Sequence, residues 1–181
     1  MTNAYPELPE LKFLRTSVTM AEVVADLIAA TAPVEVKRAS YVMFRNESAN
    51  GSKGINNNYI GAQADSGRWP DSFTDSFAGT VTIRENATNR LRIFLAFKTL
   101  SGNLAFLLDR VLRRGLYVGG RTHLVVDMPV NNEEDLARAY HKEWVTGSAE
   151  SEPSADEMTS FLSMYHQAVH LIDSPANAAA A

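Results

Sequence analysis

The chain contains no cysteine among its 181 residues. A fold without thiols uses neither disulfides nor thiolate metal ligands, so it can be stable in a reducing or an oxidising compartment. Long apolar runs are also missing, because no segment approaches the roughly 20 residues that a membrane-spanning helix needs. The first 17 residues lack a basic stretch followed by an apolar one, and we therefore expect no cleaved secretion signal.

A positive net charge is absent as well. The formal charge is −4 and the pI is about 5.6, which argues against general nucleic-acid binding, since that usually needs a basic face. The composition, 45% hydrophobic and 21% charged, is typical of one soluble domain with a real core. We expect a protein that is made in the cytoplasm, does not insert into membranes and needs a specialised route to any target outside the cell.

Helical periodicity recurs along the chain. Apolar spacing and capping residues predict helices over 17–33, 34–48, 101–115, 131–145 and 158–173. Gly115 is the expected stop of the third helix. Ser154 and Glu157 have the spacing of a capping box at the start of the last.

One segment has strand character instead. Two β-favouring runs, Thr80 to Arg84 and Leu91 to Phe97, flank the turn residues 85–89 and predict a β-hairpin. The expected fold class is therefore mainly α (α+β), a helical domain with one small hairpin inserted after the second helix. The expected parts are a core over 1–147, a polar linker over 148–157, a C-terminal helix over 158–173 that packs on the core, and a disordered tail over 174–181.

The segment "FRNESANGSKGINNNYIGAQADSGRW", residues 44–69, carries the chemistry. Glu47 falls at the C-terminal end of the second helix, where the helix dipole does not stabilise a carboxylate. A glycosidic bond needs a proton on its leaving oxygen, and a partly desolvated carboxyl can deliver one. Amides such as those of Asn57, Asn58 and Gln63 can bind sugar hydroxyls. The rings of Tyr59 and Trp69 can stack on sugar faces.

The segment "YVMFRNESANGSKGINNNYIGAQADSGRW" resembles the glycoside hydrolase family 73 glucosaminidases, the autolysin and flagellar-rod type within the lysozyme superfamily. Glu47-Ser48 matches the family's helix-ending ES dipeptide, and residues 57–61 match its Asn-Asn-aromatic-x-Gly stretch. The resemblance covers roughly residues 20 to 120. It implies a lysozyme-like fold in which a small β-lobe flanks the cleft, with Glu47 as the catalytic acid.

The hairpin in "TIRENATNRLRIFLAFKTLSG" is similar to the family's hairpin, which carries a second acid. The resemblance implies Glu85 for that acid and puts Phe97-Lys98 on the family's Phe-Arg position. The family also has a cleft tyrosine in a "GYATD"-like segment. The nearest counterpart here is "EWVTG", which would substitute Trp144, and Tyr117 is another aromatic candidate.

Each candidate also has a purely structural interpretation. Glu47 can be a helix-end acid, solvated or paired with Arg45, Glu85 can be a solvated turn acid, and residues 56–58 can be a simple turn. Asp65 and Asp75 are reserve candidates for the second acid. His166 and His170 share a helix face, but without a third ligand we interpret them as surface or packing residues. No metal or organic cofactor is expected.

The sequence therefore predicts a glycosidase that cuts β-1,4 bonds of the peptidoglycan glycan strand, after N-acetylglucosamine. Retaining, inverting and substrate-assisted mechanisms stay open. The expected setting is an antibacterial effector, delivered by a system such as type VI secretion into the periplasm of a target cell. Such an effector has a cognate immunity protein that covers the cleft. The alternatives are a lytic transglycosylase, a phage endolysin and a non-catalytic glycan-binding domain.

Overall fold

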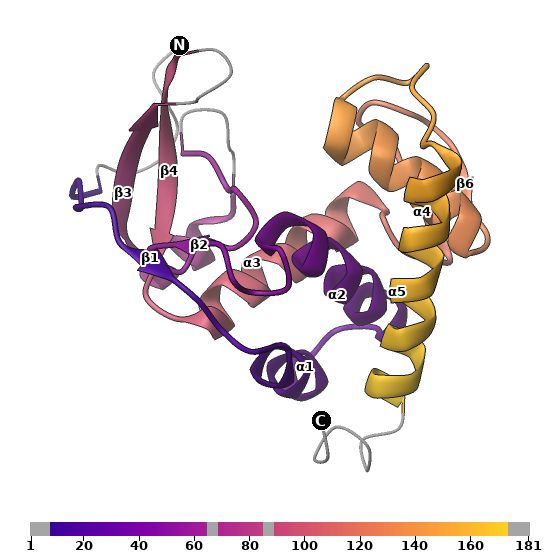
Figure 1. Ribbon diagram of the computed structural model, residues 1–181, viewed down its shortest axis with the longest axis horizontal. Coiled ribbons are helices and arrows are strands. Elements are labelled where there is room, and N and C mark those ends of the chain that lie inside the picture. Colours follow the sequence, from indigo (N-terminus) through magenta and orange to yellow (C-terminus); the bar gives the residue numbers. More distant parts are fainter. Residues whose placement is uncertain (1–7, 65–68, 85–88, 174–181) are drawn as a thin grey trace. The chain divides into compact units, whose positions relative to one another are not determined.

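The computed structural model describes residues 8–64, 69–84 and 89–173 (Figure 1). It is mainly helical with small antiparallel sheets, which confirms the predicted α+β class. The helices are α1 (Met20–Ala29), α2 (Val34–Ser48), α3 (Leu100–Arg114), α4 (Glu133–Tyr140) and α5 (Ala155–Asp173), with a 3-10 helix η1 (Asp71–Ser76) and a π-helix η2 (His141–Thr146). None of the described helices is long and apolar enough to cross a membrane.

The chain divides into two compact units. The first comprises Met1–Met20 and Phe44–Phe106, and the second comprises Ala21–Met43 and Leu107–Ala181. The boundary falls inside α2 and inside α3, so that each of these helices contributes residues to both units. The predicted linker region 148–157 belongs to the second unit, and its last three residues are the first residues of α5. The predicted tail over 174–181 lies outside the described residues.

The first unit is built around the β-hairpin of β3 (Phe77–Arg84) and β4 (Leu91–Phe97), which is visible in Figure 1. The structure confirms this hairpin, and β3 begins three residues before the predicted run. The ladder is irregular between Phe77 and Gly79. A Cβ on Gly79 would lie only 2.3 Å from the carbonyl oxygen of Pro9, so this glycine allows a second segment to approach the strand closely.

Both edges of the hairpin are covered. On the β3 edge, Leu11 N–H donates to the carbonyl of Thr80 (2.7 Å), and Thr80 N–H donates to that of Pro9 (2.9 Å). On the β4 edge, Ala64 N–H donates to the carbonyl of Ile93 (2.7 Å). The outer edge of each strand therefore forms backbone hydrogen bonds with a further segment. An isolated hairpin would leave these edge N–H and C=O groups without protein partners.

A shorter ladder joins the N-terminal segment to the loop after α2. Strand β1 (Arg15–Thr16) pairs antiparallel with β2 (Gly54–Ile55). Sequence patterns did not predict this ladder, because two residues are too few to show alternation. Its consequence is that residues 12–16 lie along the loop that follows Glu47.

Aromatic rings form the core of the first unit. Phe106 on α3 contacts three other phenylalanine rings edge-on, with centroid separations of 5.3 Å to Phe73, 6.0 Å to Phe77 and 5.5 Å to Phe97. Such T-shaped pairs contribute about 0.5–1.5 kcal/mol each beyond the apolar area that they bury. The cluster ties η1 and the hairpin to the start of α3.

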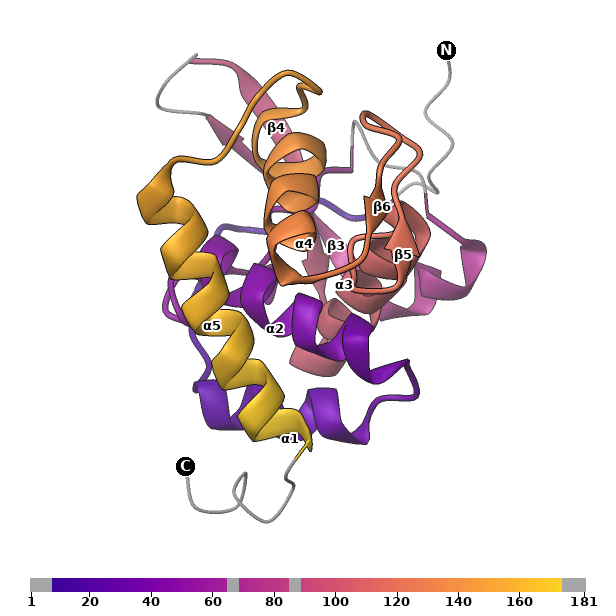
Figure 2. The ribbon, with the colours of Figure 1, turned by 90° about the vertical axis from the view of Figure 1, so that its right-hand side faces the viewer.

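The second unit is a small helical assembly in which α4 and α5 lie side by side (Figures 1 and 2). Tyr140 and Phe161 meet between them, with ring centroids 5.7 Å apart. The ladder of β5 (Gly120–Arg121) and β6 (Pro129–Val130) packs beside α4 (Figure 2). This second short ladder was also absent from the predicted elements.

Capping residues fix the helix ends in this unit. Asn132 accepts the N–H of Asp135 through its side chain (2.9 Å) at the start of α4. The predicted capping box at α5 is present: Ser154 N–H donates to Glu157 Oε2 (2.8 Å), and Glu157 N–H donates to Ser154 Oγ (3.3 Å). Gly115 ends α3 with φ +68° as expected.

The predicted helix over 131–145 differs from the structure. The α-helix ends at Tyr140, and the chain continues as the π-helix η2 until Gly147, whose φ of +64° ends it. Apolar periodicity does not distinguish a π turn from an α turn over so few residues. The wider turn changes which side chains of residues 141–146 point inward, and it buries Glu143.

We predict that Gly54→Ala lowers the free energy of unfolding by about 1–3 kcal/mol, because its Cβ would lie 2.3 Å from Cε1 of Tyr59 and 2.5 Å from Oγ1 of Thr16. Urea denaturation measures the change. Gly102→Ala is the matched control, since this glycine lies inside α3 and its new Cβ would approach no atom closer than 3.3 Å. The control should change stability by less than about 1 kcal/mol. Equal effects of the two variants would contradict the packing described for Gly54.

Candidate functional site

Glu47 lies in the last turn of α2, as predicted, and its side chain is exposed. Two residues earlier, Arg45 donates from Nε to Oδ1 of Asn50 at 2.7 Å, across the turn that ends the helix. The same turn is closed by Asn50 N–H, which donates to the carbonyl of Arg45 (3.0 Å). The glutamate is thus presented from a helix end whose following turn is internally bonded.

Ser48, the second residue of the ES dipeptide, is fully buried and caps the helix. Its Oγ donates to the carbonyl of Phe44 (2.5 Å) and accepts the N–H of Gly51 (2.8 Å). The three residues after it have positive φ: 49° at Ala49, 56° at Asn50 and 81° at Gly51. Positive φ is costly for residues other than glycine. The two hydrogen bonds of Ser48 Oγ offset part of the backbone strain at Ala49 and Asn50 and stabilise this turn.

Gly51 is required at this turn. Its Cβ, if it had one, would lie 2.4 Å from the carbonyl oxygen of Val18. The two backbones approach closely enough to form a hydrogen bond, in which Val18 N–H donates to the carbonyl of Gly51 at 2.9 Å. The turn after Glu47 is therefore fastened to the N-terminal segment of the same unit.

Asn56 and Asn57 tie the next part of the loop to two other segments. The side chain of Asn56 accepts Leu14 N–H (2.8 Å) and donates to the carbonyl of Lys12 (3.0 Å). The side chain of Asn57 donates to the carbonyl of Phe97 at 3.2 Å. Both residues have positive φ, 49° and 58°, which asparagine tolerates better than most residues. In this conformation the two amides hold the loop against the segment that precedes β1 and against the end of β4.

Asn58 and Tyr59, both predicted to bind substrate, are buried within the first unit at 4% and 1% exposure. The amide of Asn58 uses both of its ends: Nδ2 donates to the carbonyls of Ala62 (2.8 Å) and Leu95 (2.9 Å), and Oδ1 accepts the N–H groups of Ile60 (3.3 Å) and Ala62 (3.0 Å). The Tyr59 ring packs on Phe44 with centroids 5.4 Å apart. Neither side chain is presented to solvent, and both organise the loop.

Gln63 and Trp69 are half-buried in the same unit. Gln63 Oε1 accepts a bond from Arg92 at 3.4 Å, and its backbone forms a bridge with Phe94 of β4. Trp69 packs edge-on against Phe77 (5.1 Å) and Phe106 (6.4 Å), so it joins the aromatic core. Both side chains keep some exposed surface beside these contacts.

Two candidates for the second acid, Glu85 and Asp65, lie outside the described residues. Asp75, the other reserve candidate, is exposed on η1 in the first unit. Glu47 and Asp75 are therefore the two candidate acids within the described residues.

Tyr117 and Trp144 belong to the second unit and are half-buried. Trp144 lies on the π-helix η2 and faces the guanidinium of Arg114, whose Cζ is 4.9 Å from the indole centroid. Burial lowers the pKa of Arg114, and the charge of Glu143 opposes that shift. The geometry is that of a cation–π contact between the end of α3 and η2.

Sequence reasoning missed Glu143. This residue is 4% exposed, and its Oε1 accepts the backbone N–H groups of Val125 (2.7 Å) and Val126 (2.9 Å). A buried carboxylate is costly unless such donors compensate it. The carboxylate thereby fixes the loop between β5 and β6. Its sequence context, a charged residue in "HKEWV", gave no signal, because the burial follows from the π-helical turn.

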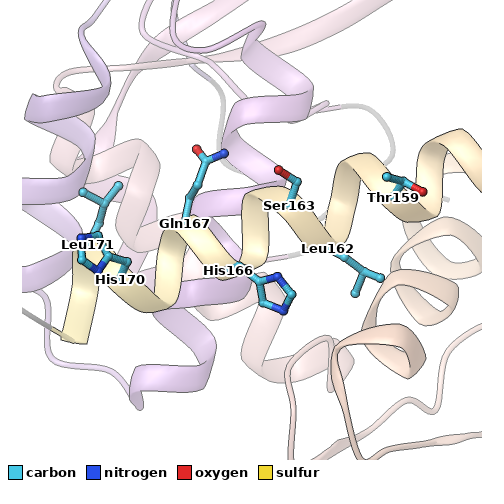
Figure 3. Close-up of a pocket in the computed structure, with 7 residues that line it drawn as sticks. All are labelled: Thr159, Leu162, Ser163, His166, Gln167, His170 and Leu171. Carbon is cyan, nitrogen blue, oxygen red and sulfur yellow. The ribbon is translucent and has the colours of Figure 1, made fainter.

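His166 and His170 line a shallow hollow on α5 (Figure 3). All seven side chains that line it come from this one helix. His166 Nε2 lies 3.5 Å from Glu133 Oε1, and both side chains are exposed. Among the described residues no group of three His, Cys, Asp or Glu could hold a metal ion. The predicted interpretation of these histidines as surface residues agrees with their exposure.

Comparison of the chain with protein-family models, with curated proteins and with solved structures gives no match. The assignment of a site therefore depends on the residues themselves. The segment that combines an exposed acid with a heavily bonded loop is 47–58, and we take it as the candidate functional site.

We predict that Asn58→Ala lowers the free energy of unfolding by about 2–4 kcal/mol, because it leaves several buried backbone groups without partners. Asn57→Ala should cost less than half as much, since its amide is only partly buried and its bonds are longer. Urea denaturation of both variants gives the comparison. A fully stable Asn58→Ala variant would show that the amide does not hold this loop.

Proposed function

We propose that this protein is a peptidoglycan glycosidase of lysozyme-like fold that cuts β-1,4 bonds of the glycan strand after N-acetylglucosamine. One observation carries the proposal: Glu47 is an exposed acid at the end of α2, and the chain after it is fixed by Ser48 and by the amides of Asn56 to Asn58. Catalysis by an acid needs this combination of an accessible carboxyl and a rigid support.

In the proposed reaction, the carboxyl of Glu47 donates its proton to the leaving glycosidic oxygen as the bond to the anomeric carbon breaks. The positive charge that develops on the sugar needs a second carboxylate or the substrate's own acetamido group. A water molecule then adds its oxygen to the anomeric carbon, and a carboxylate that acts as base accepts the proton of this water, which completes the hydrolysis. Glu85 is our candidate for that carboxylate. A separation from Glu47 of about 5 Å would favour a retaining reaction, and one of about 6.5–9.5 Å would leave room for an inverting water.

The hydrogen bonds within the loop after Glu47 limit which of its side chains can contact the sugar. The amides of Asn57 and Asn58 are engaged in holding the loop, so they act on substrate indirectly, by positioning the backbone after Glu47. Gln63 and Trp69, in the same unit as Glu47, keep partly exposed surface and remain our candidates for sugar contacts. Tyr117 and Trp144 belong to the second unit and remain candidates from the sequence. Hydrogen bonds to hydroxyls and stacking on sugar faces are the interactions that these side chain types supply.

We predict that Glu47→Gln lowers the rate of wall hydrolysis by about 10²- to 10⁴-fold, the usual contribution of a positioned proton donor. The loss of turbidity of purified cell walls measures the rate, and urea denaturation confirms that the variant is folded. Asp71→Asn is the matched control, because Asp71 is an exposed acid of the same unit that has no proposed role in the reaction. It should keep near wild-type activity. A folded Glu47→Gln variant with wild-type activity would refute the role of Glu47.

We further propose that the protein acts in the periplasm of a target bacterium and that a cognate immunity protein binds it there. The substrate lies outside the cytoplasmic membrane, so the protein should lyse an expressing bacterium only when it is fused to an export signal. Growth and lysis curves with and without the signal provide the measurement. Equal toxicity without export would contradict a wall target, and the absence of any neutralising protein encoded nearby would contradict the effector role.

A further inference from the structure

The two units of the chain differ strongly in charge. The residues of the first unit include nine Lys and Arg against seven Asp and Glu, whereas those of the second include eight against fourteen. The net charge of −4 therefore combines a unit of +2 with a unit of −6. The unit that contains Glu47 is the one with the positive balance.

Four exposed cations of the first unit come from segments that are bonded to the loop after Glu47. Arg15 lies on β1, which pairs with β2. Lys12 precedes this strand, and its carbonyl accepts a bond from the side chain of Asn56. Lys98 follows β4, and its carbonyl accepts a bond from Asn57 at 3.4 Å. Lys53 is part of the loop itself. We call these four residues the basic patch.

Backbone hydrogen bonds link the residues of the basic patch to the loop that follows Glu47. Lys53 N–H donates to the carbonyl of Ser48, the residue after Glu47, at 2.9 Å. Each of the other three cations is connected to the same loop through an asparagine or through the β1–β2 ladder. The backbone contacts that support the turn after Glu47 therefore also fix the Cα positions from which these four cations extend.

Within the described residues, no acid forms an ion pair with any member of the basic patch. The second unit is different, because Arg113, Arg121, Arg138 and Lys142 all pair with nearby carboxylates. Phe13 and Leu14, between Lys12 and Arg15, are 52% and 60% exposed. Arg15 lies over the Phe13 ring, with its Cζ 5.8 Å from the ring centroid. Exposed cations without an acidic partner among the described residues, next to exposed apolar side chains, favour a partner with negative charges and apolar groups.

We propose that the basic patch binds the carboxylates of the peptide stems of peptidoglycan, so that the preferred substrate is the peptide-bearing strand and not the bare glycan. This inference rests on the proposed function and specifies its substrate. Stem peptides combine free carboxylates with alanine methyl groups. The cations attract the carboxylates, and Phe13 and Leu14 offer apolar surface to the methyl groups. The long-range attraction raises the rate of encounter and weakens as salt screens it.

The test compares Lys53→Gln/Lys98→Gln with the wild type on glycan strands that carry peptides and on the same strands stripped by an amidase. The ratio of kcat/KM on the two substrates should fall about five- to tenfold in the variant, and added salt should lower the wild-type ratio towards that of the variant. Ala25→Glu/Ser160→Glu is the matched control, since it changes the net charge equally at exposed helical positions of the second unit. This control should keep the wild-type ratio.

Binding is measured separately by co-sedimentation with intact sacculi, in the Glu47→Gln background so that no cleavage occurs. Loss of binding on removal of the two lysines supports the inference even if the wild type cuts no glycan, an outcome that would refute the proposed function alone. Unchanged binding and an unchanged substrate ratio would overturn the inference. Lysine-dependent binding to phosphatidylglycerol vesicles, without lysine-dependent binding to sacculi, would also overturn it in favour of a membrane surface.

Discussion

The buried amide of Asn58 is the constraint on which the first unit most depends. Its four hydrogen bonds join the loop after α2 to itself at Ala62 and to β4 at Leu95. In the same way, Asn56 bonds the loop to the segment that precedes β1, and Asn57 bonds it to the end of β4. Backbone groups in an irregular loop must find partners, and here asparagine side chains supply them where strand pairing cannot. The turn that carries Glu47 is attached to this loop, so its position follows from the same bonds.

The sequence predicted helix bounds and the hairpin correctly where residues close together in the chain determine the structure. The bounds of α2, the stop at Gly115 and the box between Ser154 and Glu157 are of this kind, because caps act within one helical turn. The hairpin was predicted for a similar reason, since its alternation and turn lie within one short segment.

Features that depend on distant partners were not predictable in the same way. The sequence offers an Asn-rich loop, but only the structure distinguishes amides that bind backbone carbonyls from amides that face a ligand. Tyr59 has an aromatic ring of the kind that stacks on sugars, but the residue is only 1% exposed, because Gly54 leaves room for the ring inside the first unit. The two-residue ladders and the π-helical turn that buries Glu143 likewise arise from pairing and packing across the chain.

We propose that the bonded loop supports an acid, Glu47, that breaks a glycosidic bond. Mass spectrometry of the fragments released from purified peptidoglycan tests this role most directly. We expect saccharide fragments with N-acetylglucosamine at a free reducing end, which disappear when Glu47 is replaced by Gln. Fragments that end in an anhydro sugar would instead identify a lytic transglycosylase. The absence of any glycan fragment from wild-type digests would contradict the enzymatic account itself and leave a glycan-binding or interaction domain.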